Sequence, residues 1–378
     1  MLNLQAYVHA LSIPFKLDFT HSQARRLASD SLIVELSDGE YSGFGEAVAR
    51  EYVTGTSSSD TKEITAVVGR ILRRLLDSEV SIDTVLPVLL SPKWPAAELP
   101  LLCAVEGALL DLLCKRQKVD VYTLLHMEPR RQELIYGGTL PILPPSAAEK
   151  MLGAYLQAGI PNLRIKLARD TEYNRRILEK ARQMLGDDYD LRVDANAAWS
   201  VDETVDGLPL LREFGISLIE EPLGRNWDGM RRIGAVPESG NFLFVADESA
   251  VSFQDIEQIS QDASFGMINI RLSKHGGLLR SLHMARLAEE HGQSYQLGCH
   301  VGETGILSGL GRVAASLMKQ PVYVDGSYDR HLLADNIITE DYTFGYGGVA
   351  SIRRNQAAGY IVDTSKLEKL TSDYYACS

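Results

Sequence analysis

The tripeptide Arg-Ile-Lys at 164–166 decides the fold, together with three acidic motifs that follow it. Asp194 stands in Val-Asp-Ala-Asn, Glu220 in Ile-Glu-Glu-Pro and Asp247 in Ala-Asp-Glu-Ser, each at the carboxyl end of a short apolar run. Successive motifs are 26–28 residues apart, and a strand, a helix and two loops need about that many residues. The spacing therefore predicts repeated βα units, whose strand-end side chains would meet at one mouth of a closed barrel.

From residue 132 onward, apolar runs alternate with amphipathic stretches that have a helical period. Alternation of this kind, repeated eight times, favours a (β/α) barrel over an open sheet. The predicted strands are 134–141, 163–167, 190–194, 216–221, 243–247, 266–272, 294–299 and 322–325. The predicted helices between them include 146–158, 171–185, 200–213, 252–261 and 276–291.

The first part of the chain predicts a small antiparallel sheet followed by helices. Residues 3–9 and 31–36 alternate apolar and polar side chains, and a turn leads from the second of these strands into a third stretch. Residues 13–26 are expected to form a long loop, and 50–55 a second irregular segment, and such loops often carry function. Helices are predicted at 60–77, at 81–90 and from about 100 to 118, and the last of these is apolar enough to be buried.

Composition excludes several classes of function. The 378 residues carry a formal net charge of −12, which argues against nucleic acid or an anionic membrane as a partner. None of the four cysteines stands in a CxxC or CxxH spacing, so no zinc site is expected and a reducing, cytoplasmic compartment is favoured. The sequence shows neither a secretion leader nor an apolar run of about 18 residues, so we expect no transmembrane helix.

The strand-end residues suggest the chemistry. Lys166 should face the barrel interior, because its sequence neighbours Ile165 and Leu167 point toward the helix layer. A single strand-end carboxylate is more often a helix cap, but three in consecutive units would repel one another unless a cation lay between them. Oxygen ligands of this kind suit Mg²⁺, with Mn²⁺ as the alternative. A lysine beside such an ion would be a base of lowered pKa, suited to removing a proton next to a carboxylate.

These motifs, with Asn-Ile-Arg-Leu-Ser-Lys-His-Gly-Gly at 269–277, resemble the enolase superfamily and, within it, the mandelate racemase/muconate lactonizing enzyme group. The resemblance begins at Gly-Phe-Gly-Glu-Ala and extends to the tail. It implies a (β/α)7β barrel at 131–344, with an α+β capping domain built from 1–130 and a returning tail, 345–378. It also implies Mg²⁺ on the three carboxylates, and Lys166 as the base that takes the proton α to a substrate carboxylate.

One residue departs from the pattern of this family. Arg271 stands where the family has a second catalytic lysine. Arginine stays protonated, so it can bind a carboxylate or steady an enolate but is a poor base. Lys274 either replaces the missing base or is a solvated lysine at a helix start. His300 is the other candidate acid or base, since related racemases place a histidine near there; otherwise it contacts substrate or is packed.

Further residues are candidates for substrate contact, and each has a plain structural alternative. Segments 15–26 and 50–55 would close over the barrel mouth. Glu303 either binds a cationic group of the substrate or caps the helix that follows. The substrate-binding candidates are Arg164, Asn196, Glu303, Tyr52, Arg25 and Asp325, with His21 and Arg26 beside them on the capping loop. Asn196, Glu221 and Glu248 are also expected to support the metal ligands.

The leading hypothesis is therefore an enzyme that enolizes a small carboxylate such as an amino-acid derivative or a dipeptide. Two bases would give a racemase or epimerase, whereas one base opposite an arginine would favour a cycloisomerase or a lyase that removes water. A non-catalytic metal-binding barrel is the alternative from another class. The resemblance also implies a homo-oligomer.

Overall fold

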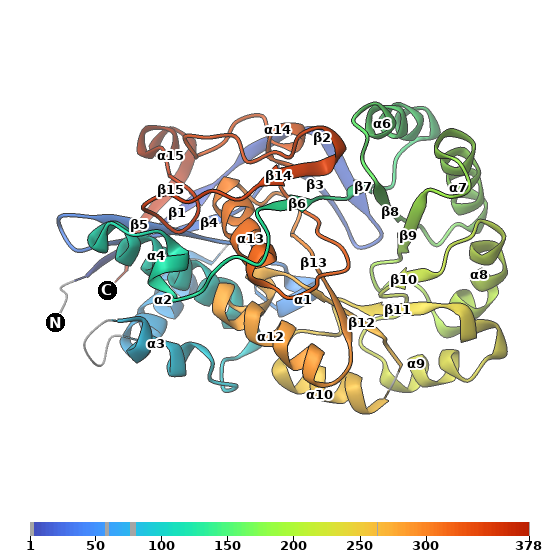
Figure 1. Ribbon diagram of the computed structural model, residues 1–378, viewed down its shortest axis with the longest axis horizontal. Helices are drawn as coiled ribbons and strands as arrows, with labels where there is room; N and C mark the ends of the chain where they lie inside the picture. Colours follow the sequence, from blue (N-terminus) through green and yellow to red (C-terminus); the bar gives the residue numbers. More distant parts are fainter. Residues whose placement is uncertain (1–3, 57–59, 76–80, 263, 378) are drawn as a thin grey trace.

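The computed structural model describes residues 4–56, 60–75, 81–262 and 264–377. Figure 1 shows a ring of parallel strands and helices on one side, and a smaller sheet with its own helices near the two chain termini on the other. The predicted fold class, a TIM-like barrel with an α+β cap, is confirmed by this arrangement. The exact domain boundaries stay a prediction.

The barrel sheet follows the order of the chain. Its seven strands are arranged β13-β12-β11-β10-β9-β8-β7, and every neighbouring pair is parallel. Lys166 is therefore paired with Asp194, and Asp194 with Glu220, across adjacent strands. The strands are β7 (Gly138–Leu140), β8 (Asn162–Lys166), β9 (Asp190–Asp194), β10 (Leu218–Glu220), β11 (Leu243–Ala246), β12 (Met267–Ile270) and β13 (Ser294–Leu297).

The segment 322–325, predicted as an eighth strand, joins the two edges of this sheet through isolated contacts. Val324 forms a parallel bridge with Leu297, and its carbonyl accepts a hydrogen bond from the N–H of Gly137 (3.0 Å). The chain then turns away at Gly326, where φ is +132°. The barrel is thus closed by a segment too short to be a regular strand.

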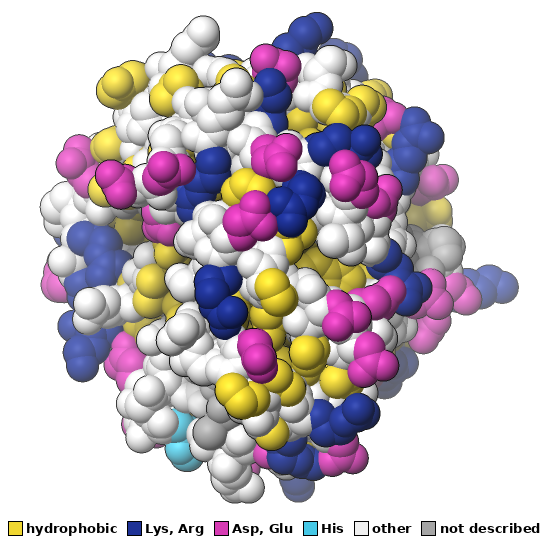
Figure 2. All heavy atoms as spheres, turned by 90° about the vertical axis from the view of Figure 1, so that its right-hand side faces the viewer, with side chains coloured by type: hydrophobic (Ala, Val, Ile, Leu, Met, Phe, Trp, Pro, Cys, Tyr) yellow, Lys and Arg dark blue, Asp and Glu magenta, His cyan; other side chains and the backbone are white. Residues whose placement is uncertain are grey.

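Helices form the outer layer of the barrel, as the periodicity predicted. Helix α7 begins and ends at the predicted residues, and the other predicted helices shift by one or two residues at their ends. The outer helices are α6 (Pro145–Gln157), α7 (Thr171–Leu185), α8 (Val201–Glu213), α9 (Trp227–Gly234), α10 (Phe253–Asp262), α11 (Leu272–His275), α12 (Leu278–Glu290) and α13 (Gly305–Leu317). On the face over α7 to α9, basic and acidic side chains are interspersed with apolar ones (Figure 2).

The cap is a four-stranded sheet in the order β15-β1-β4-β5. The tail strand β15 pairs antiparallel with β1, so both ends of the chain lie in one sheet. The cap contains β1 (Gln5–Leu11), β4 (Leu32–Ser37), β5 (Ser42–Ala47), β15 (Thr371–Cys377), α1 (Glu51–Thr54), α2 (Thr61–Leu75), α3 (Ile82–Leu89) and α4 (Leu99–Gln117). Short elements complete the chain: α5 (Val121–Leu124), β6 (Glu133–Ile135), α14 (Asp329–Leu332), β14 (Val349–Ser351) and α15 (Thr364–Leu370).

Helix α4 lies directly against strand β5 because that strand offers two glycines. A Cβ on Gly43 would lie 2.1 Å from the carbonyl oxygen of Ala108, and one on Gly45 would lie 2.0 Å from that of Ala104. The helix is buried along its first 16 residues, which confirms the prediction made from its apolar surface. This contact forms the core of the cap, and α4 also packs against α11 of the barrel.

Two buried carboxylates of the cap hold the ends of barrel helices. Glu46, on β5, accepts hydrogen bonds from the N–H groups of Thr304 (2.8 Å) and Leu307 (3.1 Å) at the start of α13. Glu106, on α4, accepts them from Leu278 and Leu279 at the start of α12. A carboxylate at a helix N-terminus satisfies orphan donors and favours the helix dipole. The cap is therefore fastened to the barrel by hydrogen bonds that each helix needs.

Three sequence expectations are corrected. Residues 50–55, expected as an irregular segment, contain the short helix α1 (Glu51–Thr54). Residues 13–26, expected as a loop, form most of a ribbon of β2 (Ile13–His21) and β3 (Ala24–Ser29). Phe15, Leu17 and Phe19 alternate with polar residues there, so the strand period was present in the sequence. The predicted strand 134–141 is split, because β6 leaves the barrel and pairs with β14. Residues 3, 76 and 77 of the predicted elements lie outside the described residues.

We expect Glu106→Ala to lower the free energy of unfolding by about 1–3 kcal/mol, because the N–H groups of Leu278 and Leu279 would be left buried without a partner. Urea unfolding of the full chain measures the change. Ser200→Ala, which removes the more exposed cap of α8, is the matched control and should cost about 1 kcal/mol or less. An equal or smaller loss in Glu106→Ala would contradict this account of the junction.

Candidate active site

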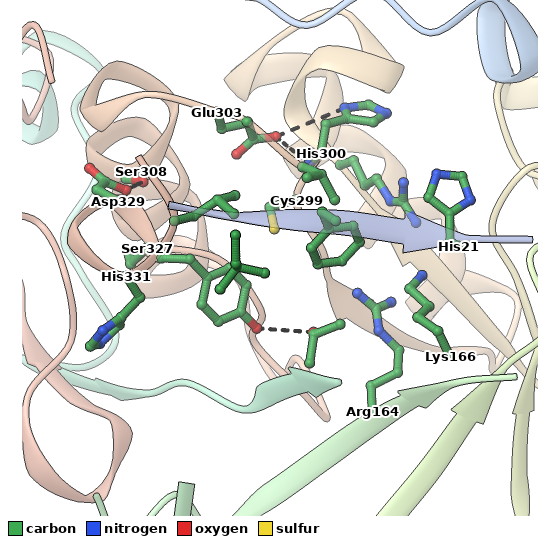
Figure 3. A pocket seen from close by; sticks show the side chains of 18 of the residues that line it. His21, Arg164, Lys166, Cys299, His300, Glu303, Ser308, Ser327, Asp329 and His331 are labelled. Carbon is green, nitrogen blue, oxygen red and sulfur yellow. Dashed lines mark hydrogen bonds and ion pairs between the residues drawn. The ribbon is translucent and has the colours of Figure 1, made fainter. Parts of the chain in front are cut away.

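A cavity lies at the carboxyl ends of the barrel strands, next to the β2–β3 ribbon (Figure 3). It encloses about 960 Å³, part of which is open to solvent. Arg164 and Lys166 lie at one end, and Arg271 is near them because it approaches the same Glu220 as Arg164. Glu303 and Asp329 lie toward the other end. Its apolar walls are made by Leu17, Phe19, Met151, Tyr155, Tyr328 and Leu332. The cavity therefore combines a cationic end, suited to a carboxylate, with a largely apolar chamber.

Lys166 ends strand β8 and lines the cationic end of the cavity. The side chain is buried, and its Nζ donates a hydrogen bond to Asp194 Oδ2 (2.5 Å). Burial lowers the pKa of the Lys166 ammonium, although the carboxylate of Asp194 opposes the shift. Ile165 and Leu167 are fully buried on either side, so packing fixes the direction in which the amine points.

Glu220, at the end of β10, is held by chain donors on both oxygens. Arg164 Nη1 lies 2.7 and 2.8 Å from its two carboxylate oxygens. Asn269 and Gln296 each donate one further hydrogen bond of 2.8 Å. Arg164 also forms an ion pair with Asp325 (3.2 Å). Although burial opposes it, the guanidinium of Arg164 holds the pKa of Glu220 well below its usual range.

Asp247, which follows β11, is bound by two cationic side chains. Arg271 Nη2 donates to its Oδ2, and Lys274 Nζ donates to its Oδ1 (2.8 Å) and to its carbonyl oxygen (2.7 Å). Lys274 also donates to the carbonyl of Asn269 (2.8 Å) and is fully buried, so the expectation of a solvated lysine was wrong. Burial lowers the pKa of Lys274 to about 7.

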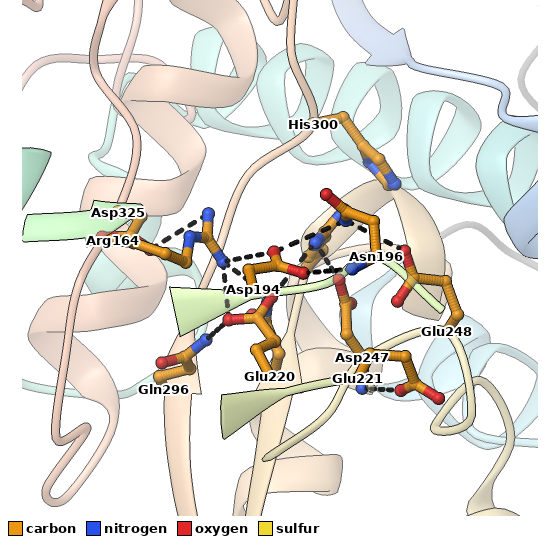
Figure 4. Close-up of polar contacts among 12 residues, drawn as sticks. Arg164, Asp194, Asn196, Glu220, Glu221, Asp247, Glu248, Gln296, His300 and Asp325 are labelled. Carbon is orange, nitrogen blue, oxygen red and sulfur yellow. Dashed lines mark hydrogen bonds and ion pairs between the residues drawn. The ribbon is translucent and has the colours of Figure 1, made fainter. Parts of the chain in front are cut away.

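The donor chemistry of this cluster fits a divalent ion. Asp194, Glu220 and Asp247 are buried oxygen donors at adjacent strand ends, and two unpartnered buried oxygens, Asn196 Oδ1 and Glu248 Oε2, belong to the same polar cluster (Figure 4). Within residues 4–56, 60–75, 81–262 and 264–377, however, no three His, Cys, Asp or Glu side chains are arranged so that they could hold one ion. Each of the three carboxylates instead forms an ion pair with a cationic side chain of the protein.

Around this cluster, Glu221 and Asn196 brace the backbone. Glu221 accepts hydrogen bonds from the N–H of Asp247 (2.6 Å) and of Ser249 (3.1 Å). The N–H of Asn196 donates to Asp194 Oδ1 (2.7 Å), and its side chain donates to Glu248 (3.3 Å). Glu221 thus fixes the backbone at Asp247, and Asn196 fixes the carboxylate of Asp194; their support of a metal site stays a prediction.

His300 lies in the loop between β13 and α13 and lines the cavity. Its ring is buried, and neither ring nitrogen has a hydrogen-bond partner in the described structure. Glu303 Oε1 is 3.9 Å from its Nδ1. Burial keeps the pKa of His300 well below its usual range, and the positive charge of Arg271 adds to this effect. His300 is therefore a neutral imidazole with both nitrogens free to meet a substrate.

The cap grips the loop on which His300 stands. Arg50 Nη2 donates to the carbonyl of Val301 (2.6 Å), and Ser29 Oγ donates to that of Gly302 (2.6 Å). Both donors come from the cap, and both acceptors directly follow His300 in the chain. The cap therefore sets the position of this loop as well as covering the cavity.

His21 and Tyr52 reach the cavity from the cap. The N–H of Gln23 donates to His21 Nδ1 (3.3 Å), so His21 Nε2 carries the proton and donates to the hydroxyl of Tyr52 (3.3 Å). Burial lowers the pKa of His21 to about 3, assisted by the charge of Lys166. The ribbon tip is tied to the barrel by Ser22, which donates to the carbonyl of Leu167 (2.8 Å).

The far wall of the cavity is acidic. Glu303 Oε1 accepts a hydrogen bond from the N–H of His300 (2.6 Å), so it caps the turn rather than the next helix, which Thr304 caps. Asp329 accepts hydrogen bonds from Ser308 and from Asn336 (2.9 Å). Burial raises the pKa of Glu303 to about 8 and that of Asp329 to about 6.

The structure does not bring all predicted residues together. Arg25 is exposed on the ribbon, where it pairs with Asp18, and does not line the cavity. Arg26 pairs with Asp30 (2.9 Å). Asp325 is held by Arg192 (2.6 Å) and Arg164, away from the main cavity. Sequence reasoning missed the apolar walls and the Ser327-Tyr328-Asp329 segment, although the latter directly follows the last barrel segment and so belonged at the mouth.

The comparisons with known proteins agree with this geometry. The family model described as enolase C-terminal domain-like matches residues 146–359. The chain belongs to this family. The recognition of the mandelate racemase/muconate lactonizing enzyme group is thereby confirmed, and with it the expectation of an enzyme of the isomerase type in the enolase superfamily.

Relatives with assigned activities span most of the chain. The hydrophobic dipeptide epimerase of Enterococcus faecalis is 28% identical over 305 residues, which cover 80% of this chain and 83% of the relative. The L-Ala-D/L-Glu epimerase of Clostridium acetobutylicum is 25% identical over 320 residues, covering 84% and 87%. Among solved structures, the N-succinyl Arg/Lys racemase of Bacillus cereus superposes with a TM-score of 0.86 at 21% identity, covering 99% of both chains.

A second solved structure is the dipeptide epimerase of Cytophaga hutchinsonii, complexed with Mg and the dipeptide D-Ala-L-Val. It superposes with a TM-score of 0.82 at 21% identity and covers 100% of both chains. At this identity the likeness supports the fold. No described helix is both long and apolar enough to cross a bilayer, and the cytoplasmic compartment and the homo-oligomer stay predictions.

We expect Glu303→Gln to change how stability depends on pH. The pKa of Glu303 is raised to about 8 in the folded chain, so its contribution is fully present below its unfolded pKa of about 4.3 and is lost as pH rises toward 8. The glutamine variant has no carboxyl group to ionise, so it does not lose this stability. Its free energy of unfolding should therefore rise relative to that of the wild type between pH 5 and 8, by on the order of 1 kcal/mol per pH unit. Urea unfolding across this range measures the gap, and parallel profiles would contradict the prediction.

Proposed function

We propose that this protein is a Mg²⁺-dependent epimerase or racemase that removes the proton α to the carboxylate of an amino-acid derivative, such as a dipeptide or an N-acyl amino acid. The observation that carries the proposal is the position of Lys166. Its amine is buried at the cationic end of a cavity, beside three carboxylates on adjacent strand ends. The names of the relatives, which include dipeptide epimerases and an N-succinyl amino-acid racemase, support the substrate class.

Different residues of the protein bind the substrate carboxylate, remove the α proton and exclude water. The substrate carboxylate lies against Arg164 and Arg271 at the cationic end, because guanidinium forks match carboxylate geometry. Lys166 then accepts the α proton, since burial makes the neutral amine accessible and the packed strand holds it in place. The apolar chamber takes the rest of the substrate and excludes water from the reacting carbon.

Asp194, Glu220 and Asp247 would hold the Mg²⁺ ion, with Asn196 and Glu248 beside it. When bound, the ion supplies positive charge that stabilises the enolate of the substrate carboxylate. Mn²⁺ is the alternative ion, since it accepts the same oxygen donors.

His300 is the proposed second proton carrier. It is neutral, and both of its ring nitrogens lack partners among the described residues. It reaches the cavity from the loop after β13, whereas Lys166 stands at the end of β8 (Figure 3). Glu303 Oε1, 3.9 Å from Nδ1, is the carboxyl oxygen placed to orient the ring. Arg271 lies near His300. Because arginine is a poor base, its proposed role is to bind the substrate carboxylate and steady the enolate.

The first experiment tests Lys166. In deuterium oxide with Mg²⁺, a panel of dipeptides and N-succinyl amino acids should show α-proton exchange by NMR with the wild-type protein. Lys166→Ala should lower the exchange rate roughly 10³-fold, as expected for loss of a general base. Lys180→Ala removes a surface lysine of α7 that pairs with Glu149 (3.7 Å) and should leave exchange unchanged. Exchange retained in Lys166→Ala would refute the assigned base.

The second experiment tests the two-base assignment. Each epimer of an active substrate is incubated separately, and exchange from both epimers requires a proton carrier on each face. His300→Asn should keep exchange from one epimer and lower it from the other roughly 10²-fold. One-sided exchange in the wild type would instead favour a lyase or a cycloisomerase, for which Lys166 alone is the base opposite Arg271.

A further inference from the structure

Arg271 lies between two of the three carboxylates that would hold the ion. Its Nη2 donates to Asp247 Oδ2 and is 3.6 Å from Glu220 Oε1. The side chain leaves the end of β12 and is buried; β12 lies next to β11, which Asp247 follows, and two strands away from β10, which ends in Glu220. A guanidinium nitrogen thus stands where oxygen ligands from two strands approach each other.

The local charge makes this position significant. Asp194, Glu220 and Asp247 already face four cationic side chains, which are Arg164, Lys166, Arg271 and Lys274. A divalent ion would add two positive charges to this buried cluster, which already contains four basic side chains. Like charges a few ångströms apart in a protein interior repel strongly, so the ion competes with those of the four side chains that keep both their charge and their position.

We propose that Arg271 is an internal cation that competes with the divalent ion for Asp247 and Glu220, and that a substrate carboxylate releases it. The proposal rests on the proposed function, since it concerns the same ion and the same substrate group. It makes Arg271 a positioning residue that couples two binding events.

Arg271 is the cation of this group that is able to move. It lines the cavity, and Asp247 is the one described residue that its guanidinium contacts at hydrogen-bond distance, so its fork can turn toward a carboxylate that enters. Lys274, by contrast, is fully buried, does not line the cavity and is held by three oxygen acceptors. Arg164 is fixed by Glu220 and Asp325.

The coupling follows from this difference. An arriving carboxylate brings negative charge to the cationic end and offers Arg271 a bidentate partner. Asp247 Oδ2 and the space beside Glu220 then become available to the ion. By linkage, the carboxylate must tighten binding of the ion by the same factor by which the ion tightens binding of the carboxylate.

The experiment is a calorimetric titration with Mg²⁺ alone, which needs no turnover. Arg271→Met removes the competing charge and keeps much of the apolar volume, and it should bind Mg²⁺ about tenfold more tightly than the wild type. Arg271→Lys keeps the charge on a shorter side chain and should fall between the two. Should the methionine variant fail to fold by circular dichroism, the lysine variant decides, because an affinity no tighter than wild type overturns the proposal.

Arg231→Met is the matched control. It removes an arginine that forms an ion pair with Asp262 (2.6 Å) on the outer helices, so it tests the effect of net charge and should leave Mg²⁺ affinity unchanged. Equal affinities in wild type and Arg271→Met would overturn the competition but leave the proposed function standing. Absence of Mg²⁺ binding in every variant would instead count against the metal site itself.

The second half of the proposal is tested by repeating the titration with the dipeptide L-Ala-L-Glu present. Wild-type affinity for Mg²⁺ should rise several-fold with the dipeptide, and the rise should be smaller in Arg271→Met because the competing cation is already gone. An equal rise in both proteins would overturn the role of Arg271 as the link.

Discussion

The structure depends on the balance between buried carboxylates and buried cations at the carboxyl ends of the barrel strands. Asp194, Glu220 and Asp247 would be prohibitively costly to bury alone. Each is instead matched by a cation from strand β8 or from helix α11. Parallel pairing of consecutive strands makes this matching possible, because it places Lys166 next to Asp194 and Asp194 next to Glu220. The same register that closes the barrel therefore assembles the site.

The cap contributes more than a cover. Through Arg50 and Ser29 it holds the backbone just after His300, and through Glu46 it holds the start of the following helix. Through Ser22 the ribbon contacts the backbone just after Lys166. Both proposed proton carriers thus stand beside a segment that the cap fixes, so their separation is set by the junction of cap and barrel rather than by the barrel alone.

Sequence reasoning could reach the barrel and its strand-end residues because a period of about 27 residues is a local signal. The carboxylates and Lys166 follow apolar runs at that period, so their convergence needed no knowledge of long-range contacts. The ribbon at 13–29 is harder to predict, because a long insertion between strands is usually an irregular loop, although apolar and polar residues alternate along this one.

Other features have no local signal at all. Lys274 was expected in solvent because lysine usually is, and only the folded barrel shows the acceptors of Asp247 and Asn269 that bury it. Asp325 was expected to contact the substrate, but it forms ion pairs with two arginines from other strands. The cross-domain caps at Glu46 and Glu106 join residues more than 170 positions apart, and no periodicity predicts such a pairing.

The tail strand β15 has a consequence for synthesis of the chain. It is the strand next to β1 at one edge of the cap sheet, and it follows all the barrel strands in the chain. While the ribosome still holds residues 371–377, β1 has an unpaired edge and the cap sheet is unfinished. The barrel can gather its strands in the order they emerge, but the cap completes its sheet only after residues 371–377 have emerged as well. An unfinished β1 edge is also open to pairing with another chain, so the nascent protein is most exposed to association in the interval before residues 371–377 emerge.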